Sequence, residues 1–296
     1  MKIEPWPDKN TLMHLRFPFS FFLLPVFMFA LSAAREIHWA NVFLTFFILH
    51  FLVFPSSNGY NSLNDHDTGS IGGLKNPPPV SSQLFYTTLF MDIIAVTAGL
   101  LISPAFSLLV LLFILVSRAY SYRPIRLKKF AFLSFMIVSS FQGGLVFLMS
   151  TIAIHDVIPE LTPELILGMT ISTLFIGSVY PLTQIYQHQS DKNDGIITIS
   201  YKLGYTGTFI FSAILFLAAT VLVFEFYYNL RTPRYFQLFT MVMLPVVIWF
   251  VFWFIKVLRS QQQANYRNTM FMNMVTAICM NLFFLFLVVN RYGKWY

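Results

Sequence analysis

Residues 58–69 read Asn-Gly-Tyr-Asn-Ser-Leu-Asn-Asp-His-Asp-Thr-Gly and open a polar stretch that runs to residue 83 between two long apolar segments. If the preceding helix continues into this stretch, Asn58, Asn61 and Asp65 lie on one face, at i, i+3 and i+7. Asn61 and Asp65 can then contact one shared ligand. Their oxygen atoms suit Mg²⁺, and the plainer alternative is a solvated loop between two helices.

Asp67 is a further candidate ligand, but it lies roughly 200° around a continuous helix from Asp65. It joins the same site only if the helix unwinds beyond Asp65. The glycines at positions 69, 72 and 73 favour unwinding, because glycine adopts backbone conformations that other residues rarely do.

The composition is that of a membrane protein. Hydrophobic residues make up 57% of the chain and charged residues only 10%, whereas soluble domains carry about 25% charged residues. The formal net charge of +7 does not indicate nucleic-acid binding, because the basic residues lie between apolar segments, where they set membrane orientation. The single cysteine, Cys279, excludes a disulfide framework and a cysteine metal site.

Apolar segments long enough to cross a bilayer predict an all-α membrane protein. We expect a bundle of about nine transmembrane helices in a single domain covering residues 1–296. The apolar segments lie at roughly 17–35, 39–57, 83–103, 105–119, 130–153, 164–186, 205–228, 236–258 and 269–290.

The distribution of lysine and arginine predicts the orientation. With the N-terminus in the cytoplasm and the C-terminus outside, 14 of the 19 basic residues lie in cytoplasmic segments, as the positive-inside rule requires. The polar segments 58–83, 120–129 and 184–204 then share the cytoplasmic side, which predicts a cytoplasm-facing active site. We expect a multi-pass protein of a bacterial inner (plasma) membrane.

A second polar group follows the sixth apolar segment. On a continuous helix, Gln184, Gln187, His188 and Asp191 form one stripe, at i, i+3, i+4 and i+7, and Gly195 can end that helix. A polar helix end that reaches water explains such a stripe as well. Two facing carboxylate stripes, however, can hold metal ions that bridge a diphosphate, while lysine and arginine supply further positive charge.

These segments resemble the UbiA superfamily of intramembrane prenyltransferases, which has nine transmembrane helices and two aspartate-rich motifs. Asn61 and Asp65 match the first two positions of the first motif, Asn-x-x-x-Asp-x-x-x-Asp. Gly69 stands at its third position, so Asp67 is the expected substitute.

The second motif and an intervening segment extend the resemblance. Asp191, Gly195 and the later Leu-Gly pair match the second motif, whereas Gln184 and Gln187 replace its two earlier aspartates. Residues 120–128, Tyr-Ser-Tyr-Arg-Pro-Ile-Arg-Leu-Lys, match most of a segment common in the family.

The resemblance implies a Mg²⁺-dependent enzyme that transfers a prenyl group from a polyprenyl diphosphate to an electron-rich acceptor, such as an aromatic quinone precursor, within the membrane. It implies Asp65 and Asp191 as catalytic residues. The expected metal ligands are Asn61, Asp65, Asp67, Gln187 and Asp191. The expected diphosphate contacts are Lys75, Arg126, Lys128 and Lys192. The expected substrate-pocket residues are Asn58, Tyr120, Gln184 and His188.

Two alternatives stay open. A cyclase of the same superfamily would release diphosphate without an acceptor and close the prenyl chain on itself. A transporter or a non-catalytic lipid-binding protein belongs to another class, although the sequence shows no convincing internal repeat. Asp92, inside the third apolar segment, is a functional candidate by default, and we favour a buried, hydrogen-bonded acid there.

Overall fold

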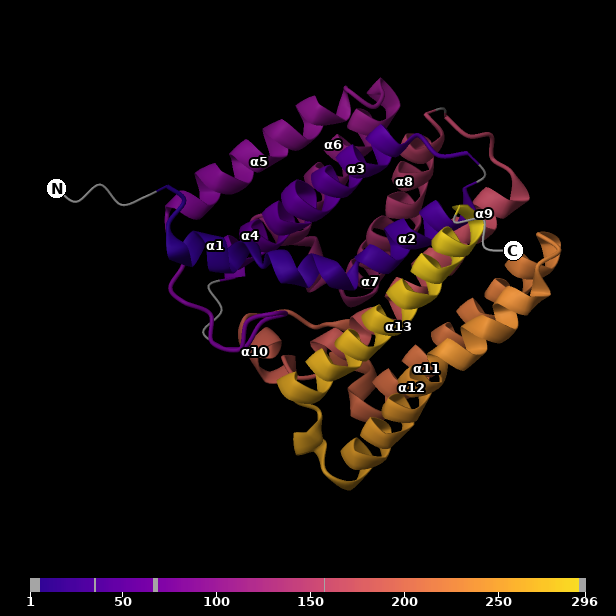
Figure 1. The fold of residues 1–296 in the computed structure, drawn as a ribbon. Coiled ribbons are helices and arrows are strands. Elements are labelled where there is room, and N and C mark those ends of the chain that lie inside the picture. Colours follow the sequence, from indigo (N-terminus) through magenta and orange to yellow (C-terminus); the bar gives the residue numbers. More distant parts are fainter. Residues whose placement is uncertain (1–5, 35, 66–68, 157, 293–296) are drawn as a thin grey trace. The chain divides into compact units, whose positions relative to one another are not determined.

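The computed structural model describes residues 6–34, 36–65, 69–156 and 158–292 (Figure 1). Within these ranges, seven helices are long and apolar enough to cross a membrane, and the number is eight if the helix pair Lys9–Phe22 and Leu24–Ala33, bent by 41°, counts as one span. The helix Gln83–Gly99 is apolar but shorter. The predicted all-α membrane fold is thus confirmed, because every predicted segment coincides with a helix, while the count of nine spans stays a prediction.

The helices group into two compact units, and the chain passes between them several times. The first unit comprises Met1–Phe21, Glu36–Lys128 and Ile152–Ile158, and the second comprises Phe22–Arg35, Lys129–Thr151 and Pro159–Tyr296. The single transmembrane domain expected from the sequence stays a prediction.

The first unit contains, wholly or for the most part, α1 (Lys9–Leu15), η1 (Phe17–Phe22), α3 (Trp39–Phe47), η2 (Ile48–Val53), α4 (Phe54–Asp65), α5 (Gln83–Gly99), α6 (Pro104–Ser121) and η3 (Leu127–Lys129). The second contains, in the same sense, α2 (Leu24–Ala33), α7 (Ala131–Ser139), η4 (Ser140–Leu145), α8 (Val146–His155), α9 (Pro163–Gln184), α10 (His188–Asn193), α11 (Ile199–Asn229), α12 (Pro233–Arg259), η5 (Gln261–Gln263) and α13 (Tyr266–Tyr292).

The helices α6, α9 and α11 each begin at a residue whose side chain caps the helix. The side-chain oxygens of Ser103, Thr162 and Thr198 accept hydrogen bonds from backbone amides three residues on, at the starts of α6, α9 and α11. Pro104 and Pro163 follow two of these caps at the first helical position, where a proline removes no helical hydrogen bond. Local sequence therefore fixes where these helices begin.

In the first unit, α4, α5 and α6 are neighbours (Figure 1). Gly59 lets α4 approach α5 closely, because a Cβ there would lie 2.9 Å from a side-chain atom of α5. Ser57 and Asn61 of α4 bond to Ser117 and Ser121 of α6, at 2.5 and 2.9 Å. Since the partners follow the same order on both helices, α4 and α6 run parallel.

The segment around α1 holds the loop of residues 69–82 by its backbone. The side chains of Asn10, His14 and Arg16 each form a hydrogen bond with a carbonyl oxygen of this loop. The carbonyl groups belong to Pro79, Pro78 and Gly72, and the distances are 3.2, 2.8 and 3.0 Å in that order. The N-terminal segment thus orders the loop that follows α4.

In the second unit, η4 and α9 come into very close contact. A Cβ on Gly143 would lie 2.5 Å from the backbone oxygen of Ser172 and 2.6 Å from the Cα of Thr173. A Cβ on the neighbouring Gly144 would lie 2.8 Å from the hydroxyl of Thr173, which accepts a hydrogen bond from the Gly144 amide at 3.1 Å. Glycine is therefore required at this crossing, as is common between membrane helices.

Replacing Gly143 by alanine is expected to lower the free energy of unfolding by about 1–3 kcal/mol, because the backbone of α9 leaves no space for a methyl group. Thermal unfolding of the purified protein in detergent measures the loss. Gly69→Ala is the matched control, since nothing lies within 4 Å of a Cβ there. Equal melting temperatures for the two variants would contradict the close contact of η4 with α9.

Candidate functional site

The polar stretch after the second span begins as a helix. The continuous helix Trp39–Asp65 extends through Asn58 and Asn61 to Asp65, which confirms that the first half of the stretch prolongs the preceding helix. Asn61 and Asp65 are therefore one turn apart on α4. Asp67 lies outside the described residues, so its part in the site stays a prediction.

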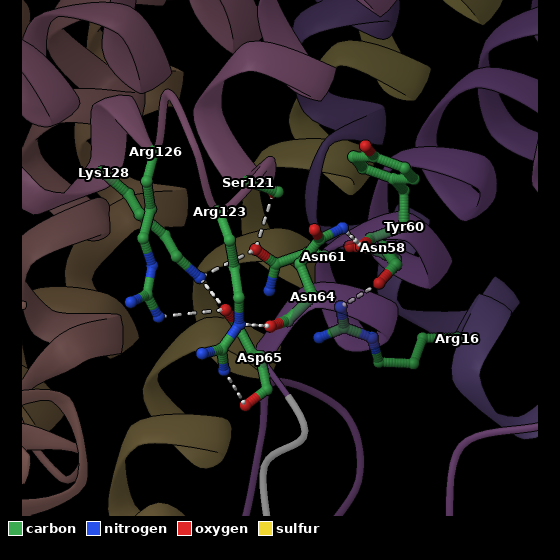
Figure 2. A network of polar contacts seen from close by, with 10 residues as sticks. All are labelled: Arg16, Asn58, Tyr60, Asn61, Asn64, Asp65, Ser121, Arg123, Arg126 and Lys128. Atoms are coloured by element: carbon green, nitrogen blue, oxygen red, sulfur yellow. Dashed lines mark hydrogen bonds and ion pairs between the residues drawn. The ribbon is translucent and has the colours of Figure 1, made fainter. Parts of the chain in front are cut away.

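Two oxygen atoms of α4 converge on one positive charge (Figure 2). The ammonium group of Lys128 donates to the carboxylate of Asp65 and lies 3.4 Å from the side-chain oxygen of Asn61. The charged side chains are nearly buried, with exposed fractions of 7% for Lys128 and 8% for Asp65. Because an unpaired charge is costly at such a position, the pair stabilises both side chains together.

Two arginines add positive charge at the same helix end. Arg126 Nη2 lies 3.8 Å from a carboxylate oxygen of Asp65. Arg123 donates to the backbone carbonyls of Asn64 and Asp65, at 2.6 and 3.4 Å. Cations stabilise the negative end of a helix dipole. Among the described residues, three cationic side chains thus contact the end of α4 beside a single carboxylate, an excess of positive charge that suits an anionic ligand.

A strained turn brings two of these cations to α4. Pro124 prevents α6 from continuing far beyond Ser121. The amides of residues 125 and 126 then donate to the carbonyl of Tyr122, at 3.0 and 2.7 Å. Arg126 has a φ of 48°, a conformation that is uncommon outside glycine. Such strain often persists at functional sites, and here it returns Arg126 and Lys128 to the end of α4.

Three residues that sequence reasoning did not assign contact the site. Ser121 donates to the side-chain oxygen of Asn61 at 2.9 Å, and Arg123 holds the last carbonyls of α4. Arg16 donates to the carbonyl of Asn58 at 2.9 Å. Ser121 is one of the matching positions of the family-like segment 120–128, so that segment contained a signal for it, whereas Arg123 is a position at which the segment departs from the family.

The other predicted residues of the first unit have distinct environments. Asn58 and Tyr120 are half-buried, in the middle of α4 and near the end of α6. Lys75 is exposed on the loop of residues 69–82, and its backbone carbonyl accepts a hydrogen bond from Ser70 at 2.8 Å. Diphosphate contact by Lys75 and substrate contact by Asn58 and Tyr120 stay predictions.

In the second unit, the prediction that one continuous helix carries a polar stripe from Gln184 to Asp191 is wrong. The helix α9 ends at Gln184, the chain turns through a 3.0 Å hydrogen bond from the Gln187 amide to the Gln184 carbonyl, and α10 begins at His188. The break allows side chains on both sides of it to hold the start of α11. Contacts with the start of α11 therefore end α9 at Gln184, although the spacing of the following polar residues is helical.

Ser200 is the partner at the start of α11. Its amide donates to the side-chain oxygen of Gln184 at 3.4 Å, and its hydroxyl lies 2.7 Å from the ring nitrogen of His188. Gln184 and His188 are buried, and the His188 ring stacks on Tyr205 with 5.0 Å between ring centroids. These contacts give both residues a structural role, and substrate contact by either stays a prediction.

The remaining candidates of the second motif lie on or beside α10. Asp191 and Gln187 are half-buried, and the Asp191 carbonyl accepts a hydrogen bond from the Ile196 amide at 2.8 Å. Lys192 is exposed, with its ammonium 5.8 Å from the ring centroid of Tyr201. Gly195 has a φ of 73°, which only glycine adopts easily, and it turns the chain after α10.

Comparisons with known proteins agree with this architecture. The model of the UbiA prenyltransferase family matches residues 22–276. The chain belongs to this family. No curated protein matches the sequence.

Solved structures of UbiA homologues share the fold. A homologue from Archaeoglobus fulgidus bound to DMAPP and Mg²⁺ has a TM-score of 0.66 and 15% identity, over 95% of this chain and 99% of that one. The apo homologue from Aeropyrum pernix K1 has a TM-score of 0.66 and 16% identity, over 93% and 98%. A structure described for digeranylgeranylglyceryl phosphate synthase has a TM-score of 0.62 and 18% identity, over 96% and 98%.

The donor set of this UbiA family member fits a partly protein-bound Mg²⁺. Within the described ranges, no group of three or more His, Cys, Asp or Glu side chains is arranged to hold a metal ion. Asn61 and Asp65 nevertheless present two oxygens to one cation, the Lys128 ammonium. Mg²⁺ commonly takes one or two carboxylates and completes its shell with water and substrate phosphates. The end of α4 therefore suits a metal that arrives with a phosphorylated substrate.

The protein is expected to lose stability on acidification through His188. Burial lowers the pKa of His188 from 6.5 to about 4. Between these values the unfolded chain binds the proton more tightly than the folded chain, so this contribution is complete above pH 6.5 and falls as the pH approaches 4. The melting temperature in detergent should therefore fall less between pH 7 and pH 4.5 for His188→Gln than for the wild type. An identical fall for both proteins would contradict a depressed pKa.

Proposed function

We propose that the protein is a Mg²⁺-dependent prenyltransferase that moves a prenyl group from a polyprenyl diphosphate to an electron-rich acceptor in the membrane. The observation that carries the proposal is the convergence of the Asn61 and Asp65 oxygens on one positive charge, beside further cationic side chains. Family membership supports it, as do UbiA homologues from Archaeoglobus fulgidus bound to DMAPP or GPP with Mg²⁺.

Each group at the end of α4 has a distinct part in this proposal. Asn61 and Asp65 hold the metal, and Asp67 adds a carboxylate. Bound Mg²⁺ neutralises charge on the diphosphate and makes it a better leaving group. Arg126 and Lys128 bind the diphosphate oxygens through charge-assisted hydrogen bonds, which are stronger than neutral ones. Arg123 keeps the helix end in place through its carbonyl groups.

The reaction follows from the chemistry of an allylic diphosphate. Its C–O bond ionises, diphosphate leaves with the bonding electrons, and the allylic cation is attacked by the acceptor, which then loses one proton. Aromatic ring faces stabilise a cation, and the chain contains 35 phenylalanines and 14 tyrosines. An aromatic acceptor is the simplest electron-rich partner. The cytoplasmic position of the site and the bacterial inner membrane belong to the proposal and rest on the distribution of basic residues.

Asp65→Asn is expected to reduce turnover of a prenyl diphosphate by about a hundredfold or more, because losing even an outer partner of a metal site costs about 10–100-fold. EDTA should abolish turnover and added Mg²⁺ should restore it. Asp191→Asn should lose most activity as well, because the second motif is proposed to bind metal. Product formation by purified protein in detergent, followed by mass spectrometry, measures these effects.

Glu164→Gln provides the matched control for these carboxylate replacements. Glu164 is exposed in the first turn of α9, and its replacement makes the same chemical change away from both motifs. Turnover should be unaffected in this variant. Wild-type turnover by Asp65→Asn, with membrane expression retained, would remove the proposed metal site at the end of α4.

Acceptor dependence is expected to distinguish transfer from cyclisation and from passive binding. With prenyl diphosphate and Mg²⁺ alone, diphosphate release should be slow. A suitable acceptor from a quinone-precursor panel should accelerate release and yield a conjugate with the mass of acceptor plus prenyl minus one hydrogen. Rapid release without acceptor, with a hydrocarbon or prenyl alcohol as product, would identify a cyclase. Lipid binding without diphosphate release under any condition would identify a non-catalytic protein.

A further inference from the structure

A second polar cluster joins α4, α5 and α6, and the proposed reaction does not use it. Asp92 of α5 is 8% exposed. One of its carboxylate oxygens accepts hydrogen bonds from Arg118 of α6, from Nε at 2.9 Å and from Nη2. The other accepts from the hydroxyl of Ser56 of α4 at 2.5 Å. Asp92 is therefore the buried, hydrogen-bonded acid that the sequence favoured, with an arginine as its partner.

Stability alone does not account for this ion pair. A charge within a membrane-spanning helix is costly, and such residues usually mark a functional region. Replacing a buried ion pair by well-packed apolar residues is often neutral or stabilising. Apolar side chains can therefore hold helices together as well as a buried ion pair does. What an ion pair adds is direction, because its hydrogen bonds fix the orientation of both partners.

Arg118 also contacts α4, so it connects the ion pair to that helix. Its guanidinium carbon lies 3.9 Å from the ring centroid of Tyr60, which is a close cation–π contact. Tyr60 directly precedes Asn61 on α4, and Arg118 lies one turn before Ser121 on α6. Two neighbouring contacts therefore join α4 to α6: the cation–π contact of Arg118 with Tyr60, and the hydrogen bond from Ser121 to Asn61.

We propose that Asp92 and Arg118 are positioning residues for the site at the end of α4. Asp92 fixes the guanidinium plane of Arg118, and that plane holds the Tyr60 ring. The contact sets the rotation of α4 at which the side-chain oxygen of Asn61 faces Ser121 and Lys128. This inference rests on the proposed function for the part of Asn61 as a metal ligand.

The contact between Arg118 and Tyr60 is tested by two replacements at Tyr60 and one at Arg118. Tyr60→Leu removes the ring and leaves the ion pair intact, whereas Tyr60→Phe keeps a ring beneath the guanidinium. Arg118→Lys keeps a positive charge for Asp92 but loses the planar group, which lysine does not replace. Thr97→Val is the control on α5, because the Thr97 hydroxyl bonds only to carbonyls of its own helix.

Mn²⁺ serves as the metal probe, and its electron paramagnetic resonance signal gives the dissociation constant in the presence of inorganic diphosphate. Tyr60→Leu and Arg118→Lys are each expected to raise this constant about tenfold, the lower range for outer partners of a metal site. Tyr60→Phe should bind Mn²⁺ more tightly than Tyr60→Leu. The double variant Tyr60→Leu/Arg118→Lys should bind no more weakly than either single variant, because both act through one contact.

Melting temperatures and steady-state kinetics separate positioning from a purely structural role. Positioning predicts weaker Mn²⁺ binding and a higher KM for Mg²⁺ in Arg118→Lys, at a melting temperature close to that of Thr97→Val. Wild-type Mn²⁺ affinity in a folded Tyr60→Leu protein overturns the proposal, as does a loss of affinity that only accompanies unfolding. If Asp65→Asn also binds Mn²⁺ like the wild type, the metal site itself is refuted. If Asp65→Asn loses Mn²⁺ binding while the Tyr60 and Arg118 variants keep it, the metal site is retained and the positioning by Asp92 and Arg118 is refuted.

Discussion

A carboxylate at the end of a membrane helix needs a cation close by, and the pairing of Asp65 with Lys128 meets that requirement. The arrangement of residues 121–128 follows from it. The helix α6 ends at Ser121, and a turn with a positive φ at Arg126 brings both Arg126 and Lys128 back to α4. The energetic need of one acidic group thus explains why Arg126 and Lys128 lie beside Asp65.

The departures from the family's second motif also have a physical explanation. Gln184 is buried, and its side-chain oxygen accepts the backbone amide of Ser200. A carboxamide fills this position without a charge, whereas a carboxylate there would need a cation beside it. His188 is likewise buried against Ser200 and Tyr205. In this chain, neutral side chains in the second motif stabilise the start of α11, and Asp191 is the one of the motif's three aspartate positions that carries a carboxylate.

The sequence predicted what depends on local periodicity and composition. The apolar segments gave the helices, and the helical repeat placed Asn61 and Asp65 one turn apart. The family-like segment gave Arg126 and Lys128. Contacts set by tertiary packing were missed, because no local pattern encodes them: the arginine that pairs with Asp92 lies 26 residues away on another helix.

The second motif shows the same limit of sequence reasoning. The spacing of Gln184, Gln187, His188 and Asp191 is helical, and a continuous helix was the natural prediction. The helix ends at Gln184 because Gln184 and His188 both bond to Ser200, which lies sixteen residues after Gln184 and twelve after His188. Where a helix end packs against another part of the chain, those tertiary contacts determine where the helix ends. The residue pattern of the helix segment itself does not contain this information.

The hold of the N-terminal segment on the loop after α4 has a consequence for evolution. Asn10, His14 and Arg16 contact carbonyl oxygens of the loop, and every residue type presents such an oxygen. Apart from Ser81, whose hydroxyl donates to Asp8, and Gly72 and Gly73, which pack against Phe19, mutations can therefore accumulate in the loop's side chains without loosening its attachment, provided that its length is kept. Related chains should then diverge in loop composition while insertions and deletions between residues 69 and 82 are selected against.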